Sequence, residues 1–480
     1  MAKISHKTSL FWFRRDLRVK DNEALHTAAN ESDFLICIYI HSPKEESPWP
    51  PGGASRWWLH HALSDLEKNL KKLGSHLIIK SGSSADIIKS IAEENSVSKV
   101  YWNRLYDPTT IKRDIQIKEE LTSANIKVFS FPGSLLKEPW EIKNSSGNPY
   151  QVFTPFWRAL SGQISDLEPD LEIRKFPPST KTVHSDELST LKLLPKISWD
   201  KEFYPFWKPT EKGAWDILEN FIISSIQDYK TERDFPFKQA TSFLSPYLHF
   251  GQITPKSIWR TIHNAFNSSK VNSIEPFLRQ LGWRDFAHHL LYHFPHTDSE
   301  PLKSDFKNFP WQRNKPALSA WQKGQTGVPI VDAGMRELWA TGIMHNRVRM
   351  IAASFLVKNL RIHWIEGAKW FWDTLVDADL ANNSLGWQWV AGSGADAAPY
   401  FRIFNPVSQS EKFDSEGLYI RKWVPEISSL PDKWIHKPWE APKNVLDAAN
   451  VILGKTYPKL LCDLKATREE ALNAYYSLKK

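Results

Sequence analysis

The chain has 480 residues, of which 41% are hydrophobic, and its 62 Lys and Arg exceed its 54 Asp and Glu, which gives a formal net charge of +8. One hydrophobic core rarely supports a chain of this length, so we expect two domains. The basic balance suits a polyanionic partner, although charge alone does not identify one. The 23 Trp and 26 Phe add aromatic faces, which stacked bases or a flat cofactor would need.

The two cysteines, Cys37 and Cys462, are far apart in the sequence and exclude a disulfide framework or a zinc site built from cysteines. The N-terminus has no apolar signal region, and no run of about 18 apolar residues occurs. We therefore expect a cytoplasmic protein with no membrane segment and no metal centre.

Residues 8–130 alternate short apolar runs with stretches of helical period. The runs are 10–13, 35–40, 76–80, 99–102 and 126–130. Between two of them, leucines recur three to four residues apart over 56–73, which predicts an amphipathic helix. This alternation predicts βαβ units and a doubly wound parallel sheet. The glycine fingerprint of dinucleotide-binding folds is absent after the first run, which argues against a pyrophosphate cradle there.

The rest of the chain changes character twice. Residues 166–211 are rich in Pro, Ser and charge and show little periodicity, as expected of a long connector. From Ala214 onward helical period dominates, with Pro and Gly as punctuation. We predict an α/β domain at 1–135, a connector at 136–213 and an all-α domain at 214–480.

The stretch 377–389 contains two acids, three amides and two tryptophans. Each buried polar group must find a hydrogen-bond partner or cost about 1–3 kcal/mol, so a polar, aromatic molecule is expected in the space that they line. The order of residues over 377–406 closely resembles the flavin-binding core of the photolyase/cryptochrome family, most closely its class I cyclobutane-dimer photolyases. The resemblance covers almost the whole chain, including residues 11–22, and implies an antenna in the α/β domain and FAD in the helical domain.

Hydroxyl groups cluster in 241–251, shortly after Tyr229 and Arg233. Such a loop before a helix is either a set of N-caps or an anion site. It resembles the FAD diphosphate loop of the family, which would make Tyr229, Thr241, Ser242, Leu244 and Ser245 FAD-binding residues. The chain departs from the family at Phe243, where many relatives carry Arg or Lys.

Gln280, Trp283 and Arg284 are spaced to share one helical face. An ordinary polar face would show the same pattern. By resemblance this face forms one wall of the cavity, where Trp283 stacks on damaged bases and Arg284 reaches the flavin. Gln280 would contact the base edges of the dimer and also the flavin. Cyclobutane-dimer enzymes usually carry Glu at the position of Gln280.

Asn346, Arg349 and Met350 also share a helical face, and Arg349 could form an ion pair with Asp377. An ion pair by itself is weak evidence of function. By resemblance Asn346, Arg349, Asp377 and Asp379 contact the flavin. Ile343 replaces a Trp that cyclobutane-dimer enzymes usually carry.

Asn383 matches the residue beside the flavin N5 in the family, where an amide can donate or accept a hydrogen bond and cannot ionise. Many plant cryptochromes have Asp at that position, so Asn383 favours a repair enzyme. Trp387, Trp364 and Trp311 match the electron-transfer triad of the family. Each alone would be an ordinary core residue, and only the joint match indicates a conduit.

DNA contacts are also implied by the resemblance. Arg347 and Arg402 match residues that hold the phosphates beside the lesion, and Trp389 matches a second wall of the lesion pocket. Together with Trp283, Asn346 and Met350 they fit the binding of a flipped nucleotide.

The resemblance therefore predicts a monomeric photolyase that acts on UV-damaged DNA and splits a flipped-out cyclobutane pyrimidine dimer by electron transfer from light-excited, reduced FAD. The antenna, if present, could be methenyltetrahydrofolate, deazaflavin or another flavin. Two alternatives stay open. One is a cryptochrome-like photoreceptor. The other is a (6-4) photolyase, favoured by Gln280 and opposed by Asn346 and Met350, which are His in those enzymes because their mechanism needs a proton donor.

Overall fold

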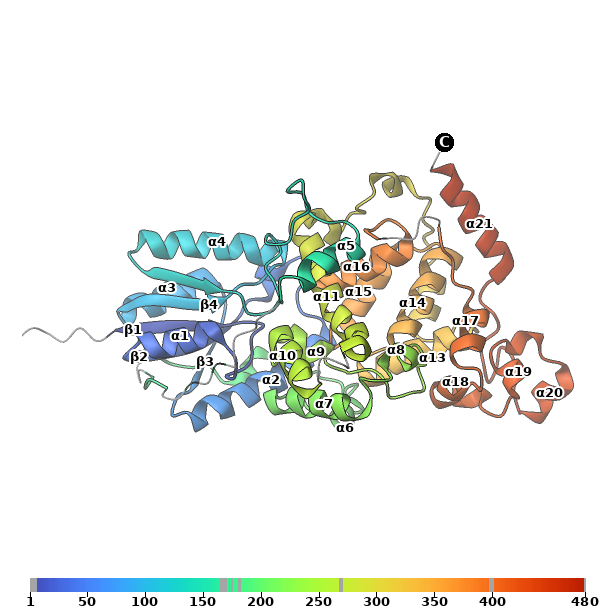
Figure 1. Ribbon diagram of the computed structural model, residues 1–480. Coiled ribbons are helices and arrows are strands. Elements are labelled where there is room, and N and C mark those ends of the chain that lie inside the picture. Colours follow the sequence, from blue (N-terminus) through green and yellow to red (C-terminus); the bar gives the residue numbers. More distant parts are fainter. Residues whose placement is uncertain are drawn as a thin grey trace, which may run out of the picture. The chain divides into compact units, whose positions relative to one another are not determined.

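The computed structural model describes residues 7–164, 171, 173, 176–179, 183–266, 271–396 and 401–478 (Figure 1). Its contacts divide the chain into two compact units. Unit 1 comprises Met1–Ile226 and Ser242–Pro295, and unit 2 comprises Gln227–Thr241 and His296–Lys480. Part of the predicted connector and residues 397–400 of the predicted core motif lie outside the described residues.

Unit 1 is built on a five-stranded parallel sheet with the order β3-β2-β1-β4-β5. The strands are β1 (Thr8–Phe13), β2 (Phe34–His41), β3 (Leu77–Ser81), β4 (Val97–Asn103) and β5 (Lys127–Phe131). Each contains one of the predicted apolar runs or most of it. The chain reverses its direction of winding beside β1, so the doubly wound α/β prediction is confirmed.

Four helices connect these strands: α1 (Glu23–Glu31), α2 (Gly53–Lys72), α3 (Ser84–Glu94) and α4 (Pro108–Ser123). Alternate strand residues such as Leu10, Ile38 and Val100 form a buried cluster with Ile88 of α3 and Ile117 of α4. Because successive strand residues point to opposite faces, the intervening residues face the other side of the sheet. Helix α2 confirms the amphipathic helix predicted at 56–73.

Unit 1 also contains helices beyond the sheet. They are α5 (Phe153–Ser161), α6 (Phe203–Phe206), α7 (Glu211–Ser224), α9 (Ser245–His249), α10 (Pro255–Ala265) and α11 (Val271–His293). A tight contact joins the end of α9 to the segment after β1. Gly251 has a positive φ of 64°, and a Cβ there would lie 2.1 Å from the Arg15 carbonyl oxygen. Glycine is therefore required at this turn.

Unit 2 is helical in its described part, with isolated bridges as its only other regular pairing. Its helices are α8 (Tyr229–Glu232), α12 (Lys315–Gln322), α13 (Pro329–Thr341), α14 (Asn346–Ser354), the π-helical turn η6 (Phe355–Asn359), α15 (Trp364–Thr374), α16 (Leu380–Ala391), α17 (Pro406–Phe413), α18 (Leu418–Trp423), α19 (Asp432–Ile435), α20 (Lys443–Ala448) and α21 (Leu464–Ser477). Helix α16 packs against both α14 and α15.

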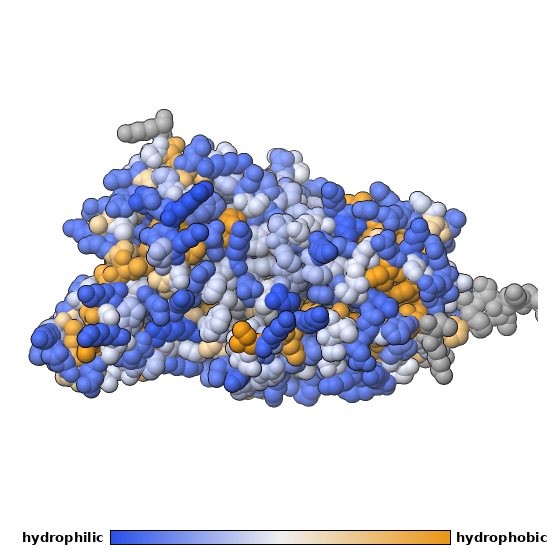
Figure 2. All heavy atoms as spheres, turned by 180° about the vertical axis from the view of Figure 1, so that it is seen from behind, coloured by the Kyte–Doolittle hydropathy of each residue, from blue (hydrophilic) through white to orange (hydrophobic). Residues whose placement is uncertain are grey.

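The molecular face in Figure 2 is mostly hydrophilic, with hydrophobic residues in separate patches. Within the described ranges, no helix combines the length and the apolar character that crossing a membrane requires.

Candidate flavin and DNA site

The centre of the predicted site in unit 2 is an ion pair between α14 and the segment that leads into α16. The Arg349 Nη2 atom donates to both carboxylate oxygens of Asp377, at 2.9 and 3.1 Å, and its Nε donates to the Met344 carbonyl at 2.7 Å. The Asp377 side chain is 5% exposed and that of Arg349 is 25% exposed. The predicted pair is therefore present, and the Arg349 side chain stays partly exposed.

Asp379 and Asn383 lie at the N-terminal end of α16 and in its first turn. Asp379 is the N-cap, and its Oδ1 accepts hydrogen bonds from the Asn382 backbone N–H at 2.9 Å and from the Asn382 amide at 2.7 Å. One turn later, Asn383 donates its side-chain N–H to the Ala368 carbonyl of α15 at 3.1 Å. This bond orients the amide and leaves its oxygen as an acceptor.

Trp387 lies one turn beyond Asn383 and is buried between α15 and α12. A Cβ on Gly367 would lie 2.1 Å from its ring, so a larger residue at that position would displace Trp387. Its ring contacts Phe371, with centroids 5.0 Å apart, and Trp321, at 6.2 Å. Trp321 is fully buried and was not among the predicted site residues.

The other two tryptophans of the predicted triad meet through a histidine. The His363 ring lies 5.8 Å from the ring of the buried Trp364 and 5.0 Å from that of the half-buried Trp311. The His363 Nδ1 caps α15 by accepting the Ile365 backbone N–H at 3.2 Å. Trp311 and Trp364 are thus joined by one aromatic residue that the sequence argument did not include.

Three predicted DNA-binding residues lie at the start of α14. Asn346 is exposed, and its amide lies 4.0 Å from the sulfur of Met350, one turn along the same face. Arg347 is not a free surface cation. Its guanidinium pairs with Asp234 at 2.8 Å and lies 4.4 Å from the Phe413 ring centroid.

Trp389 and Arg402 are both close to Phe404. The Trp389 ring lies 6.3 Å from that of Phe404, and the guanidinium carbon of the exposed Arg402 lies 4.7 Å from it. The Trp389 indole donates to the Asp396 carbonyl at 3.2 Å. The exposed Arg402 cation suits a nucleic-acid phosphate and the half-buried Trp389 ring suits a base, whereas the ring of Phe404 is buried.

The predicted diphosphate loop is divided between the units. In unit 2, Tyr229 is buried, with the Arg233 guanidinium 5.5 Å from its ring, and Thr241 is half-buried. In unit 1, the Ser242 hydroxyl accepts the Leu244 backbone N–H at 3.4 Å just before α9, whose first residue is Ser245.

Phe243, the departure in this loop, has a positive φ of 53°. Its ring packs against Phe206 and Trp207, with centroids 5.8 and 6.2 Å apart. A non-glycine residue rarely adopts this conformation, and packing of the ring holds it there. The position that is cationic in many relatives is therefore part of an aromatic cluster in this chain.

The predicted wall on α11 is formed by residues that bond to their own unit. The Gln280 amide donates to the Pro276 carbonyl at 3.1 Å. Arg284 donates to the carbonyls of Ser134 and Leu248. The half-buried Trp283 stacks on Phe153, with ring centroids 3.8 Å apart and an interplanar angle of 12°.

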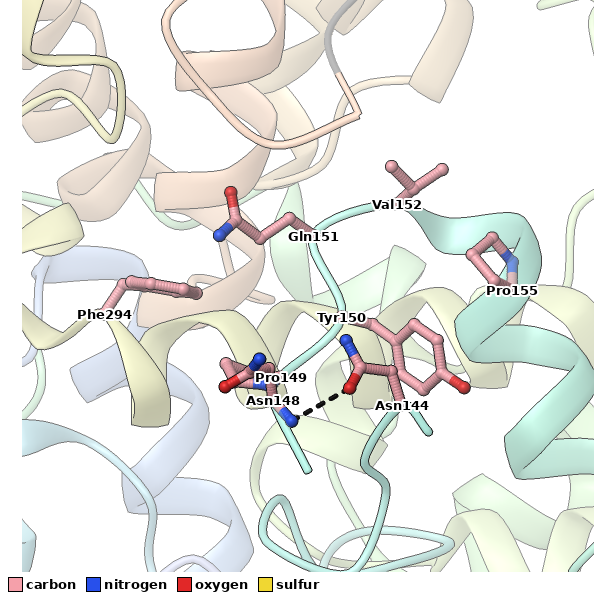
Figure 3. A pocket seen from close by; sticks show the side chains of 8 residues that line it. All are labelled: Asn144, Asn148, Pro149, Tyr150, Gln151, Val152, Pro155 and Phe294. Atoms are coloured by element: carbon pink, nitrogen blue, oxygen red, sulfur yellow. Dashed lines mark hydrogen bonds between the residues drawn. The ribbon is translucent and has the colours of Figure 1, made fainter. Parts of the chain in front are cut away.

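A surface pocket of about 480 Å³ lies in unit 1, just before Phe153 in the chain (Figure 3). It is lined by Asn144, Asn148, Pro149, Tyr150, Gln151, Val152, Pro155 and Phe294. The Asn144 side chain shapes the loop by accepting the Asn148 backbone N–H at 2.9 Å. None of the predicted site residues lines this pocket, so it is distinct from the predicted flavin site.

The chemistry of these side chains fits FAD. A flavin ring edge offers carbonyl oxygens and an N–H, for which a partly exposed guanidinium, a carboxylate and an amide are suitable partners. Arg349, Asp377 and Asn383 supply these groups on adjoining elements of unit 2. The hydroxyls and backbone N–H groups of 242–245 suit phosphate oxygens, although the cation expected at Phe243 is absent.

Comparisons with known proteins agree with this chemistry. Residues 9–177 match the family described as DNA photolyase, and residues 277–477 match the FAD binding domain of DNA photolyase. A deoxyribodipyrimidine photo-lyase from Agrobacterium fabrum is 47% identical over 99% of this chain and all of that protein. The chain belongs to the photolyase/cryptochrome family. The predicted fold class, the photolyase assignment and the FAD-binding domain are confirmed.

Two further relatives show which members of the family this chain is similar to. Cryptochrome-1 from Arabidopsis thaliana is 38% identical over 98% of this chain and 71% of that protein. A bacterial class III photolyase from Agrobacterium tumefaciens, solved by crystallography, is 46% identical, with a TM-score of 0.95 over 100% of this chain and 99% of that one.

The predicted class I branch is not supported, because the similar structure is that of a class III photolyase. The prediction rested on the order of residues over 377–406 and on Asn346 and Met350, which are of the cyclobutane-dimer type, although Gln280 and Ile343 depart from that type. Identity over the whole chain counts residues of both units, including packing residues that take no part in the reaction. A few chemical residues can identify a family without identifying a branch within it.

Besides Trp321, the residues outside the predicted set that contact predicted ones include Phe153, Asp234, His345 and His363. His345 precedes α14, and its Nδ1 accepts the Arg347 backbone N–H at 3.2 Å. Burial lowers the pKa of His345 to about 4, so this imidazole is neutral at pH 7. His345 and His363 both cap a helix, and a His directly before a helical pattern was the available sequence signal.

Proposed function

We propose that this chain repairs cyclobutane pyrimidine dimers in UV-damaged DNA in a light-dependent reaction, as an enzyme of the class III type. The observation that carries the proposal is the Arg349–Asp377 pair beside Asn383, on adjoining elements of a unit that matches an FAD-binding domain. Reduced FAD, when bound there, would supply on illumination the electron that opens the cyclobutane ring.

The residues of the chain would orient the cofactor and the lesion. Asp377 would accept from the N–H of the flavin edge while Arg349 holds that carboxylate in place. The Asn383 amide is fixed by Ala368 and cannot change its charge, which suits a site where the redox state of a neighbour changes. Trp283 and Trp389 would stack on the flipped dimer, and Asn346 with Met350 would contact its bases.

Two observations oppose a (6-4) photolyase. Asn346 and Met350, which are His in those enzymes, offer no proton donor in the required range. The neighbouring His345 does not replace them, because it is half-buried, its pKa is lowered by desolvation to about 4, and its Nδ1 serves as a helix cap. Gln280 remains the one residue that favours this alternative.

A cryptochrome-like photoreceptor is the second candidate, because Cryptochrome-1 from Arabidopsis thaliana is 38% identical over nearly the whole chain. Asn383 favours repair over this alternative. A receptor would bind the same flavin and respond to the same light, so absorption alone cannot separate the two candidates.

The experiment is to record the absorption spectrum of the purified protein and then to illuminate the reduced protein with single-stranded DNA that contains either a cyclobutane dimer or a (6-4) product. We expect flavin absorption and loss of the cyclobutane dimer only. Flavin absorption without repair of either lesion would favour the photoreceptor, and repair of the (6-4) product alone would overturn the lesion assignment. A folate or deazaflavin antenna, a monomeric state and a cytoplasmic location remain predictions.

A further inference from the structure

One lysine of unit 2 is buried, which is unusual for a charged side chain. Lys358 is 1% exposed and lies on η6, the π-helical turn that continues α14. Lysine is almost never fully buried unless its ammonium is paired. No carboxylate among the described residues forms an ion pair with Lys358, and burial lowers the pKa of its ammonium well below the usual range.

Two groups compensate the ammonium in place of a carboxylate. The Lys358 Nζ donates to the Ala391 carbonyl at 2.8 Å, and Ala391 is the last residue of α16. The carbonyl end of a helix carries partial negative charge and favours a cation. The same Nζ lies 3.0 Å from the centroid of the Phe401 ring, whose face also attracts a cation.

Phe401 is held in place by its contacts and belongs to the segment that carries Arg402. Its ring stacks on Tyr475 of α21, with centroids 4.6 Å apart and an interplanar angle of 7°. Arg402, the next residue, is exposed, and Phe404 beyond it is buried. The Phe404 backbone N–H donates to the Ser354 hydroxyl at 3.2 Å.

Phe401 and Phe404 are both held by one helical segment. Ser354 ends α14 and Lys358 lies four residues later on η6, so one continuous segment holds Phe404 and Phe401 on either side of Arg402. π-Helical turns are rare and often occur at functional sites. This geometry fixes the backbone on both sides of the exposed guanidinium.

We propose that Lys358 is a positioning residue for DNA binding, which holds Phe401 so that the exposed Arg402 is fixed in place to meet a DNA phosphate. The inference rests on the proposed function, because it assigns Arg402 to the DNA backbone. Lys358 itself is buried and cannot reach a phosphate. A change at Lys358 should therefore alter a property of DNA binding that normally depends on direct phosphate contacts alone.

That property is the salt dependence of binding. A fluorescent duplex with one cyclobutane dimer is titrated with the full-length protein at several salt concentrations. Arg402→Ala should reduce the slope of log affinity against log salt by about one unit, because one phosphate contact is lost. We expect Lys358→Met, which keeps the length of the side chain and removes its charge, to reduce the slope by a similar amount with unchanged flavin content. The double variant should show no further reduction, because both changes remove the same contact.

A matched control is Lys303→Met. The exposed Lys303 ammonium donates to the neighbouring Gly392 carbonyl at 3.4 Å, so this variant removes the same charge near the same helix end without affecting Phe401. An equal reduction of the slope in both variants would show that net charge carries the effect and would overturn the proposal. Additive reductions in the Arg402→Ala, Lys358→Met double variant would also overturn it.

Phe401→Leu keeps the inference testable where Lys358→Met fails to fold. It removes the ring face and leaves the lysine, so it should also reduce the slope. A wild-type slope in Phe401→Leu, or in folded Lys358→Met, contradicts the inference while Arg402→Ala still supports DNA binding. A wild-type slope in Arg402→Ala itself instead contradicts the DNA path of the proposed function.

Discussion

The packed helices α14 and α16 together carry the same kinds of side chain as helix α11, an arginine and an amide, yet they hold them differently. On the α16 side, Arg349 is paired with a carboxylate and Asn383 donates to a carbonyl of another helix. On α11, Arg284 donates to the backbone carbonyls of Ser134 and Leu248, and Gln280 donates to its own helix. Arg349 therefore has a charged partner where Arg284 has neutral ones, and Asn383 is bonded to a second helix where Gln280 is bonded within its own. We expect substitutions on the α16 side to have larger effects than substitutions on α11.

The largest effect is expected at Trp387, which is enclosed by its neighbours. Trp387→Phe should abolish light-driven reduction of oxidised flavin while FAD stays bound and pre-reduced protein still repairs, because Trp387 is the predicted first step of the electron route. The measurement is the flavin absorption during illumination. Trp321→Phe is the matched control, since Trp321 is equally buried and contacts Trp387 but lies outside the predicted triad. Normal photoreduction in Trp387→Phe would show that electrons take another route.

The next effect tests the ion pair. Asp377→Ala should lower the free energy of unfolding by about 3 kcal/mol, near the lower end for a broken buried pair because a quarter of the Arg349 side chain is exposed. We also expect FAD to be lost during gel filtration. Asp377→Asn, which keeps the shape and one acceptor, should have a smaller effect on both measurements. Full FAD retention in Asp377→Ala would exclude a role for this carboxylate in binding the flavin.

A smaller difference is expected between two arginines of unit 2. Arg402 is exposed, whereas Arg347 is already paired with Asp234 and its side chain is 16% exposed. Arg402→Ala should therefore reduce the salt slope of duplex binding by about one unit, and Arg347→Ala should reduce it by less. Thermal unfolding should show the reverse order, because Arg347 also packs on Phe413. A larger slope change in Arg347→Ala would show that DNA displaces Asp234.

Sequence patterns predicted the fold because the signals are local. Apolar runs predicted the five strands of the sheet, and their alternation with helical stretches predicted βαβ units and the doubly wound class. The Arg349–Asp377 pair could also be predicted, since both residues belong to recognisable motifs. The assignment of segments to a domain is harder to predict, because it depends on which distant segments pack together.

Contacts between distant segments could not be predicted. Asp234 precedes its partner Arg347 by more than a hundred residues, and Phe153 precedes Trp283 by a similar separation. Helical period places a residue on a face but does not say what meets that face. The positive φ of Phe243 has the same origin, because packing on Phe206 and Trp207 decides it.

The smallest effect is expected on α11, at Gln280. A carboxylate can accept hydrogen bonds from two base N–H groups and can stabilise charge on a reacting dimer, whereas an amide has one acceptor and one donor end. The Gln280 donor end is already bound to Pro276, which leaves the oxygen as its free acceptor. Gln280→Glu should therefore raise the repair yield per absorbed photon on cyclobutane dimers.

The structure adds a cost to this substitution. A carboxylate cannot donate to the Pro276 carbonyl, so Gln280→Glu loses a hydrogen bond that contributes about 0.5–1.5 kcal/mol. The new carboxylate must also turn away from the Pro276 oxygen, because both groups are acceptors. Dimer affinity should change little, because stacking on Trp283 and Trp389 contributes about 1–3 kcal/mol per base. Gln280→Met is the matched control, since it loses the same bond without gaining a charge, and it should not raise the yield. Quantum yields for the wild type and both variants on the two lesion types decide the question. A lower cyclobutane yield in Gln280→Glu than in Gln280→Met would show that a carboxylate at this position hinders the reaction, and the proposed role of Gln280 would then be wrong.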